Sequence, residues 1–206
     1  MKTRTKALLL AMCAVLLVVT TVMATLAFLT SQTEVVKNTF TVGNVVITLD
    51  EAKVDEDGQA TTGPRVKENT YRLYPSKEYD KDPTVHVDDA SEDCWIFVKI
   101  IDEIAVIQDA ETVAAQMANN GWTPVSGEEN VYAYREVVSA GDDIVVFESF
   151  KIKGSVDNAT LAEYNNKTIK VEAYAVQAEG FNTAAAAWDS APNSWKMDVA
   201  ETTANG

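Results

Sequence analysis

Cysteine and histidine are almost missing from this sequence. The 206 residues include two cysteines and one histidine. Cys13 lies in an apolar N-terminal run, so Cys94 has no partner for an intrachain disulfide once that run is removed. With His86 as the only histidine and no H-E-x-x-H pattern, the usual hydrolytic zinc sites lack their ligands. We expect no metal, no cofactor, no catalytic residues and no enzyme activity.

Nucleophilic catalysis has equally little support. The G-x-S-x-G pattern of serine hydrolases is absent. His86 lies in the alternating stretch Thr84–Val87, which predicts a solvent-facing histidine on a strand. Cys94 begins the alternating apolar run CWIFVKI, and this pattern predicts a small buried side chain rather than a reactive thiol.

Basic residues are scarce beside acidic ones. The chain has 17 lysines and arginines against 31 aspartates and glutamates, a net charge of −14. Such a chain repels nucleic acid and anionic lipid, so we exclude both as partners. The acidic stretches 55–58 and 88–93 lack the spacing of a calcium-binding loop, and solvated loops are favoured there.

The N-terminus has the layout of an export signal. Three basic residues precede an apolar stretch from Ala7 to about Leu29, which is typical of a signal peptide. Small residues at Thr25 and Ala27 favour cleavage between Ala27 and Phe28. We therefore assign 1–27 as a signal peptide, and the membrane is a partner only through the uncleaved signal. A retained anchor is the alternative, because a run of about 20 apolar residues can cross a bilayer.

Most of the remaining chain has the alternation and β-branched content of strands. The expected strands are Thr39–Leu49, Asn69–Leu73, Thr84–Val87, Cys94–Ile104, Val131–Val138, Asp143–Ile152 and Thr168–Gln177. Helical insertions are expected at Glu111–Asn120 and around Thr183–Trp188. This pattern predicts an all-β, jelly-roll-like antiparallel sandwich over 45–195, with a flexible C-terminal tail at 196–206.

Several blocks resemble one family of secreted bacterial proteins. The order ATLAF, a polar patch and then NTFTVGNVVITLDE is similar to the N-terminus of the TasA/camelysin family, whose signals are removed by a SipW-type peptidase. Further similar blocks are KDPTVHV, DCWIFVKI, GWTPV, VYAYREVVSAGD and VEAYAVQAEGF. The resemblance covers most of the mature chain, and its most specific parts are the signal-to-strand junction and AYAVQAEGF.

The resemblance implies a jelly-roll protein that forms extracellular fibres in a biofilm matrix. In fibre-forming members the N-terminal segment of one subunit completes the sheet of the next. The implied partners are other copies of this chain, paralogous matrix proteins and the SipW-type signal peptidase. Two alternatives stay open, a minor component that anchors or caps fibres and a camelysin-like surface metalloprotease. The second has no support from the residues, since the sequence lacks a recognisable zinc motif.

The segment 28–44 is the expected donor strand. From Val36 to Val42 the apolar residues Val36, Phe40 and Val42 fall on even positions, whereas Val45, Ile47 and Leu49 fall on odd ones. The strand therefore changes face at Gly43, where glycine permits a bulge or a break. A break would separate a donor segment from the domain's own first strand. A bulged first strand packed wholly within its own domain is the alternative.

Overall fold

The computed structural model describes residues 3, 5–6, 12–17, 44–109 and 113–196. The chain divides into two units, Met1–Thr41 and Val42–Gly206. The described residues of the first unit are helical, and nowhere in the described ranges is a helix both long and apolar enough to cross a membrane. The expected cleavage residues Ala27 and Phe28 and the donor residues Val36, Phe40, Val42 and Gly43 lie outside the described residues. These assignments therefore stay predictions.

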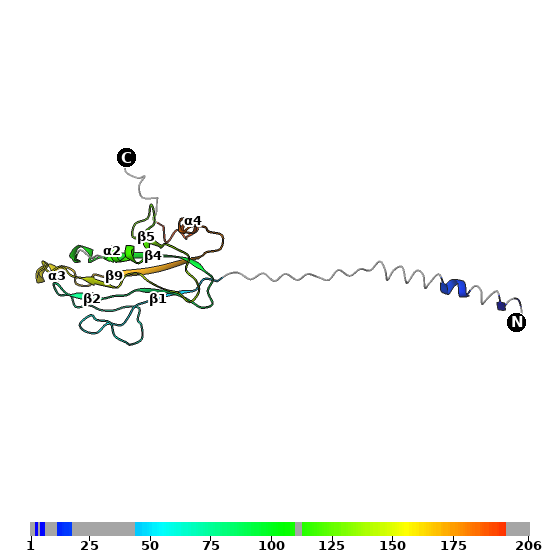
Figure 1. Cartoon of the computed structure of the whole chain (residues 1–206), viewed down its shortest axis with the longest axis horizontal. Coiled ribbons are helices and arrows are strands. Elements are labelled where there is room, and N and C mark those ends of the chain that lie inside the picture. Colours follow the sequence, from blue (N-terminus) through cyan, green and yellow to red (C-terminus); the bar gives the residue numbers. More distant parts are fainter. Residues whose placement is uncertain (1–2, 4, 7–11, 18–43, 110–112, 197–206) are drawn as a thin grey trace, which may run out of the picture. The chain divides into compact units, whose positions relative to one another are not determined.

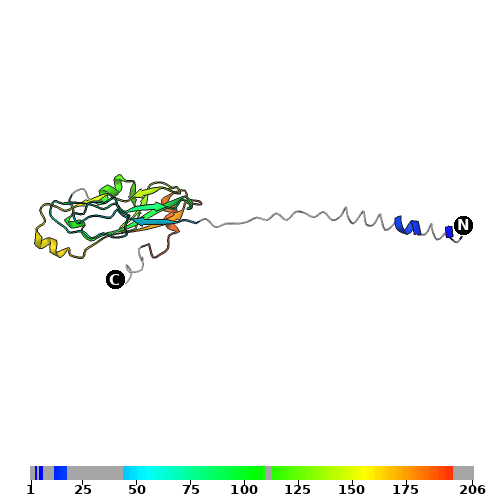
Figure 2. The same cartoon turned by 90° about the horizontal axis from the view of Figure 1, so that it is seen from below.

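The second unit is built from antiparallel strands in two layers (Figures 1 and 2). One sheet has the order β1-β3-β7 and a smaller one pairs β2 with β8; a four-stranded sheet has the order β5-β6-β4-β9. The strands are β1 (Ile47–Asp50), β2 (Glu78–Asp80), β3 (Thr84–Val87), β4 (Cys94–Asp102), β5 (Trp122–Pro124), β6 (Val131–Tyr134), β7 (Asp143–Val145), β8 (Ser149–Lys151) and β9 (Ile169–Gln177). The predicted all-β sandwich is confirmed.

Short helical segments join or cover these strands. They are η1 (Ala105–Ile107), α2 (Val113–Asn119), α3 (Asn158–Glu163) and α4 (Ala184–Asp189). The helices α2 and α4 correspond to the two predicted insertions. The helix α3 was not predicted; it begins where the Asp157 side chain accepts a hydrogen bond from the Thr160 N–H at 2.8 Å. This is ordinary N-capping by aspartate.

The central strand β4 is buried on both faces. Its even-numbered residues from Cys94 to Ile100 join the main core between the layers, whereas Trp95 and Phe97 join a second cluster on the other face. Trp188 of α4 covers that second cluster and lies 4.9 Å from Phe97, ring centroid to ring centroid. The prediction that Cys94 is a buried small side chain is confirmed, since its exposed fraction is 0%.

Aromatic rings fill the end of the main core near β2 and β8. Tyr79 stacks on Phe150 with 5.0 Å between centroids, and Tyr71 meets both rings edge-on. The buried Tyr79 hydroxyl donates to the Arg72 carbonyl and accepts from the Tyr74 N–H, each at 2.7 Å. Because both hydrogen-bonding roles are satisfied, the hydroxyl can stay in the core without a desolvation penalty. The same bonds fix the loop before β2.

Four strand predictions were wrong in extent or type. The stretch Val131–Val138 is a strand only as far as Tyr134, and of the stretch Thr39–Leu49 the described residues are a strand only from Ile47. The stretch Asn69–Leu73 alternates like a strand but is part of a loop, which holds Tyr71 and Leu73 against the core. The stretch Asp143–Ile152 divides into β7 and β8, which belong to different sheets. The buried pair Val146 and Phe147 lies between them. The short strands β2 and β5 were missed.

His86 lies on the outer face of β3, as the sequence predicts, but it is paired there and only partly open to solvent. Its side chain is 25% exposed and lies between two carboxylates from neighbouring strands. Nε2 lies 3.0 Å from Oδ1 of Asp50 on β1, and Nδ1 lies 2.5 Å from Oδ1 of Asp143 on β7. The alternation of apolar and polar residues predicts the face of the strand. The two ion pairs could not be predicted, because they depend on which strands lie beside β3.

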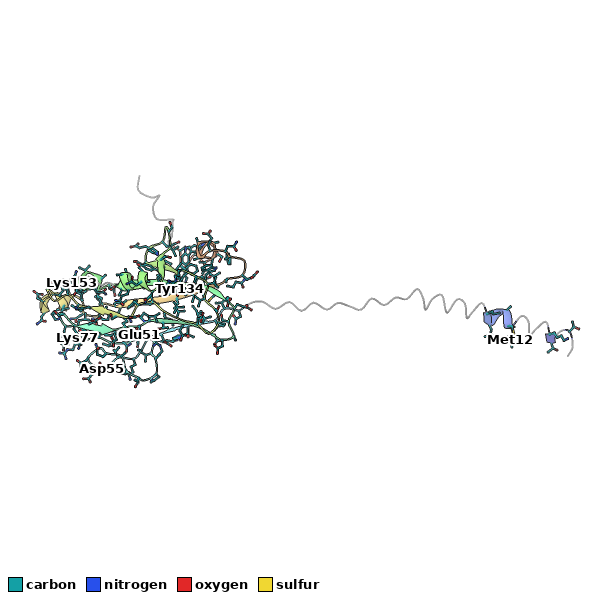
Figure 3. The ribbon with its side chains drawn as sticks, viewed as in Figure 1. Met12, Glu51, Asp55, Lys77, Tyr134 and Lys153 are labelled. Carbon is teal, nitrogen blue, oxygen red and sulfur yellow. The ribbon has the colours of Figure 1, made fainter. Side chains whose placement is uncertain are left out.

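The acidic residues 55–57 are exposed in a turn, as predicted, and the turn ends at the buried Gly58. Asp55 Oδ1 accepts hydrogen bonds from the N–H groups of Asp57 and Gln59, both at 2.9 Å. Gly58 has a φ of 73°, and a Cβ there would come within 2.4 Å of the Tyr79 ring. Figure 3 shows Asp55 on the outlying loop between β1 and β2 and Glu51 closer to the body of the domain.

Candidate functional site: a groove between two strand edges

The strand β9 forms one edge of the four-stranded sheet and presents unpaired backbone groups. Backbone hydrogen bonds join Glu103 to Thr168 and Ala178 to Asp93, the pairs just beyond the two ends of the β4–β9 ladder. Hydrogen-bonded pairs alternate along an antiparallel ladder, so β4 bonds to the even-numbered residues of β9. The N–H and C=O groups of the odd-numbered residues therefore point away from β4. Within the described part of the chain, these odd positions, Ile169, Val171, Ala173 and Ala175, make no hydrogen bond to another strand.

The strand β1 forms a second open edge. It pairs with β3 through its even-numbered residues, as the bond from Asp88 N–H to the Val46 carbonyl shows. The backbone groups of Ile47 and Leu49 point to the other side. The next residue, Glu51, has its backbone groups on that same side. Its N–H donates to the Val66 carbonyl at 2.8 Å, and its carbonyl accepts from the Val66 N–H at 2.7 Å. The outer side of β1 is thus competent to pair.

The two open edges lie close together. β1 comes within 8 Å of β9, Cα to Cα, although no hydrogen-bonded ladder joins them. Towards the end marked by α3 in Figure 1 they border a groove of about 1720 Å³. Its walls are the end of β1, the loop 67–74, the start of β9 and the segment that connects α3 to β9.

Half-buried apolar side chains line this groove. Each packs against the main core and remains partly open to solvent. They are Leu49, Tyr71, Leu73, Leu161, Tyr164, Ile169 and Val171. Ile104 and Phe150 are buried and close its floor. A groove with an apolar floor and unpaired backbone at its border suits an extended peptide, because a strand can satisfy the backbone and fill the gaps with alternate side chains.

Polar contacts hold the rim of the groove in place. Glu103 accepts hydrogen bonds from the backbone N–H and the hydroxyl of Thr168, each at 2.9 Å, and Lys167 lies 3.2 Å from its other oxygen. These bonds lower the pKa of Glu103. On the opposite wall, the Tyr71 hydroxyl donates to the Asp80 carbonyl at 2.9 Å. Burial and the nearby Glu51 carboxylate raise the pKa of Tyr71, so this hydroxyl stays a donor.

The alternation in the sequence predicts β9 and β1 but not the groove between them. Which strands lie at the edge of a sheet depends on the pairing of the whole sheet. The alternation of Tyr71 and Leu73 was the one local signal for the wall, and it was misread as a strand. Among the residues with described positions, no three histidine, cysteine, aspartate or glutamate side chains come together to hold a metal ion.

Comparisons with known proteins give no further assignment. No protein-family model matches this chain, and neither the curated proteins nor the solved structures contain a significant match.

Proposed function

We propose that this chain is a secreted structural protein of an extracellular biofilm matrix, which assembles into fibres by strand exchange. In this proposal residues 28–42 of one subunit occupy the groove between β1 and β9 of the next. The observation that carries it is that, among the described residues, the outer edges of β1 and β9 have no strand partner and lie beside a groove with an apolar floor and a polar rim. The resemblance of the N-terminal blocks to the TasA/camelysin family supports the same assembly, and with it a jelly-roll topology.

The chemistry of the donor segment complements the groove. If the segment is extended, Val36, Phe40 and Val42 would share one face because they are all even-numbered, and that face would lie on the apolar floor while backbone groups pair with β9. Val36–Val42 extends over roughly 20 Å at about 3.3 Å per residue. The donor segment 28–42 contains one acidic and one basic residue, Glu34 and Lys37, so its entry adds little net charge to an acidic subunit.

Export would control assembly. While the signal is attached, Phe28 is tethered to the membrane and the donor segment cannot thread into a neighbour. Cleavage by a SipW-type peptidase between Ala27 and Phe28 would release it. N-terminal sequencing of the secreted protein should therefore begin at Phe28. A secreted chain that begins many residues away, or a full-length chain retained in the membrane, would contradict this processing.

The direct test is a binding experiment with the segment itself. A chain that begins at Gly43 should remain a folded monomer, and a fluorescent peptide of residues 28–42 should bind to it. A matched peptide with Phe40→Asp should bind at least about tenfold more weakly, because a charge would enter an apolar groove. Electron microscopy should show fibres for the chain that begins at Phe28 and none for the truncated chain.

Each outcome separates a different model. Peptide binding without fibres of the mature chain would favour the minor anchoring or capping role. If the truncated chain is unfolded, residues 28–42 belong to their own domain as a bulged first strand, and strand exchange is wrong. If the truncated chain is folded and binds neither peptide, the groove is not the acceptor.

A further inference from the structure

A lysine, a glutamate and an asparagine meet in the wall behind the groove. Lys81 and Glu51 are 9% and 4% exposed, respectively. The Lys81 ammonium group donates to Oε2 of Glu51, and the other carboxylate oxygen, Oε1, accepts from Nδ2 of Asn69 at 3.0 Å. One carboxylate thus contacts both the amine of Lys81 and the carboxamide of Asn69.

Stability alone is a poor explanation for this arrangement. Removing a lysine and a glutamate from water costs several kcal/mol per ion, and a buried pair seldom recovers more than that cost. The surroundings are aromatic as well, since Lys81 Nζ lies 6.0 Å from the centroid of the Tyr71 ring. Desolvation favours the neutral amine of a lysine, which is its nucleophilic form, and an adjacent carboxylate can accept the proton that the amine gives up.

Hydrogen bonds hold both ends of the Asn69 carboxamide in place. Its Oδ1 accepts a hydrogen bond from the Val54 N–H at 3.0 Å, and its Nδ2 also donates to the Ala52 carbonyl at 2.8 Å. The Val54 N–H is placed to stabilise negative charge that develops on Oδ1. The nitrogen that would leave already contacts Glu51, the group that could protonate it.

We propose that Lys81 and Asn69 join through an amide bond between their side chains, with Glu51 as the acid-base group. The proposal is independent of strand exchange, because it concerns the interior of one subunit. It makes this wall of the groove the site of a self-catalysed covalent modification.

The reaction balances without a cofactor. The Glu51 carboxylate takes a proton from the Lys81 ammonium, and the free amine attacks Cγ of Asn69. The Val54 N–H stabilises the oxyanion on Oδ1. Glu51 then gives its proton to the carboxamide nitrogen, the Cγ–Nδ2 bond breaks, and ammonia leaves with the last proton as ammonium. The products are one secondary amide and one ammonium ion, and nothing is oxidised or reduced.

The bond would fix the wall of the groove. It would close the loop between residues 69 and 81, which contains Tyr71 and Leu73. Closing a loop covalently stabilises the folded chain mainly by restricting the unfolded one. The wall would then keep its shape whether or not a strand occupies the groove.

The test is the intact mass of the purified, folded mature protein. We expect a mass lower than the sequence mass by one ammonia, and a tryptic digest in which the peptide that contains Asn69 is joined to the one that contains Lys81, with no cleavage after Lys81. Lys81→Arg and Glu51→Gln should each restore the full mass. Lys77→Arg is the matched control. Lys77 lies between residues 69 and 81, but its ammonium group pairs with Asp57 at 3.1 Å, so this substitution should leave the mass deficit unchanged.

One side reaction must be distinguished. The sequence Asn120-Gly121 can also lose ammonia by cyclising on its own backbone, and that loss would persist in Lys81→Arg. A deficit that persists in this variant, or a folded wild-type protein with the full mass, overturns the proposal. A bond that forms equally fast in Glu51→Gln removes Glu51 from the reaction.

Discussion

His86 links three strands through charge, and this makes a predictable contribution to stability. Burial lowers the pKa of His86, but its hydrogen bonds and charge interactions with Asp50 and Asp143 outweigh burial and raise the pKa above 6.5. The folded protein therefore binds this proton more tightly than the unfolded chain does. The resulting stability is fully present below about pH 6.5 and is lost as the pH rises through the folded-state pKa.

We expect wild-type protein to lose stability between pH 6 and pH 8.5 relative to His86→Ala. Because these side chains are partly exposed, the difference should stay below about 1 kcal/mol. Urea unfolding at both pH values measures it. At pH 6 the variant should be the less stable protein, and both proteins should remain folded in the absence of urea. A variant with the wild-type pH dependence would show that His86 is not the titrating group.

Cys94 should be chemically inert in the folded mature protein. Burial, followed by the nearby Asp93 charge, raises the pKa of its thiol to about 11. At pH 8 roughly a thousandth of the thiol would be ionised, and the buried sulfur also excludes reagents. A thiol reagent such as DTNB should therefore react slowly with the native protein and completely in guanidinium chloride. Complete reaction within minutes without denaturant would contradict the buried position.

At the scale of the element, the two backbone sides of β9 make separable predictions. The N–H of Val171 points to the open edge, whereas that of Glu172 bonds to β4. Proline removes an N–H and is tolerated on edge strands when that group is free. Val171 also packs against the main core, so Val171→Pro should lower the melting temperature of the monomer somewhat, but by less than the loss of a hydrogen bond within the sheet does, and it should prevent fibre formation.

Glu172→Pro is the matched control. It removes a hydrogen bond within the sheet, so the melting temperature should fall by roughly 5–10 °C. Thermal unfolding of dispersed protein, measured beside a sedimentation assay for polymer, separates the two effects. Normal fibres from Val171→Pro would show that the edge of β9 does not receive the donor strand.

The sequence predicts elements well where the local signal and the packing agree. The strands β4 and β9 are each nine residues long and rich in β-branched or aromatic residues, and both were predicted within two residues. The three-residue strands β2 and β5 are too short to show alternation. Their place is set by partners far along the chain, such as Phe150 opposite Tyr79.

The groove could not have been predicted because it belongs to no single element. Its walls come from three regions, around residues 50, 70 and 170. The sequence of one region does not reveal which other segment it will lie beside. The three regions come together only through the order of the strands in two sheets. The cluster of Glu51, Asn69 and Lys81 has the same origin, since nothing in the local sequence marks any of these residues as reactive.

At the scale of the whole molecule, charge opposes assembly. Removal of the three basic residues of the signal leaves 14 basic against 31 acidic residues, a net charge of −17. Subunits that approach one another therefore repel. The distance over which this repulsion acts is shorter at higher salt concentration. The screening length is about 10 Å at 0.1 M salt and about 3 Å at 1 M. Strand addition is short-ranged and depends less on salt, because it rests on backbone hydrogen bonds and apolar contacts.

Fibre formation by the mature chain should therefore accelerate as sodium chloride rises from about 0.05 to about 0.5 M, since screening lowers the barrier to encounter without weakening the groove. Light scattering gives the rate, and electron microscopy identifies the product. Phe40→Asp is the control, because it keeps the acidic surface and disables the donor strand: it should form no fibres at any salt concentration. If salt produces the same aggregate from this variant, precipitation and not strand exchange is being measured. If salt slows the wild-type reaction, attraction between opposite charges drives assembly, and the apolar groove is not the main contact.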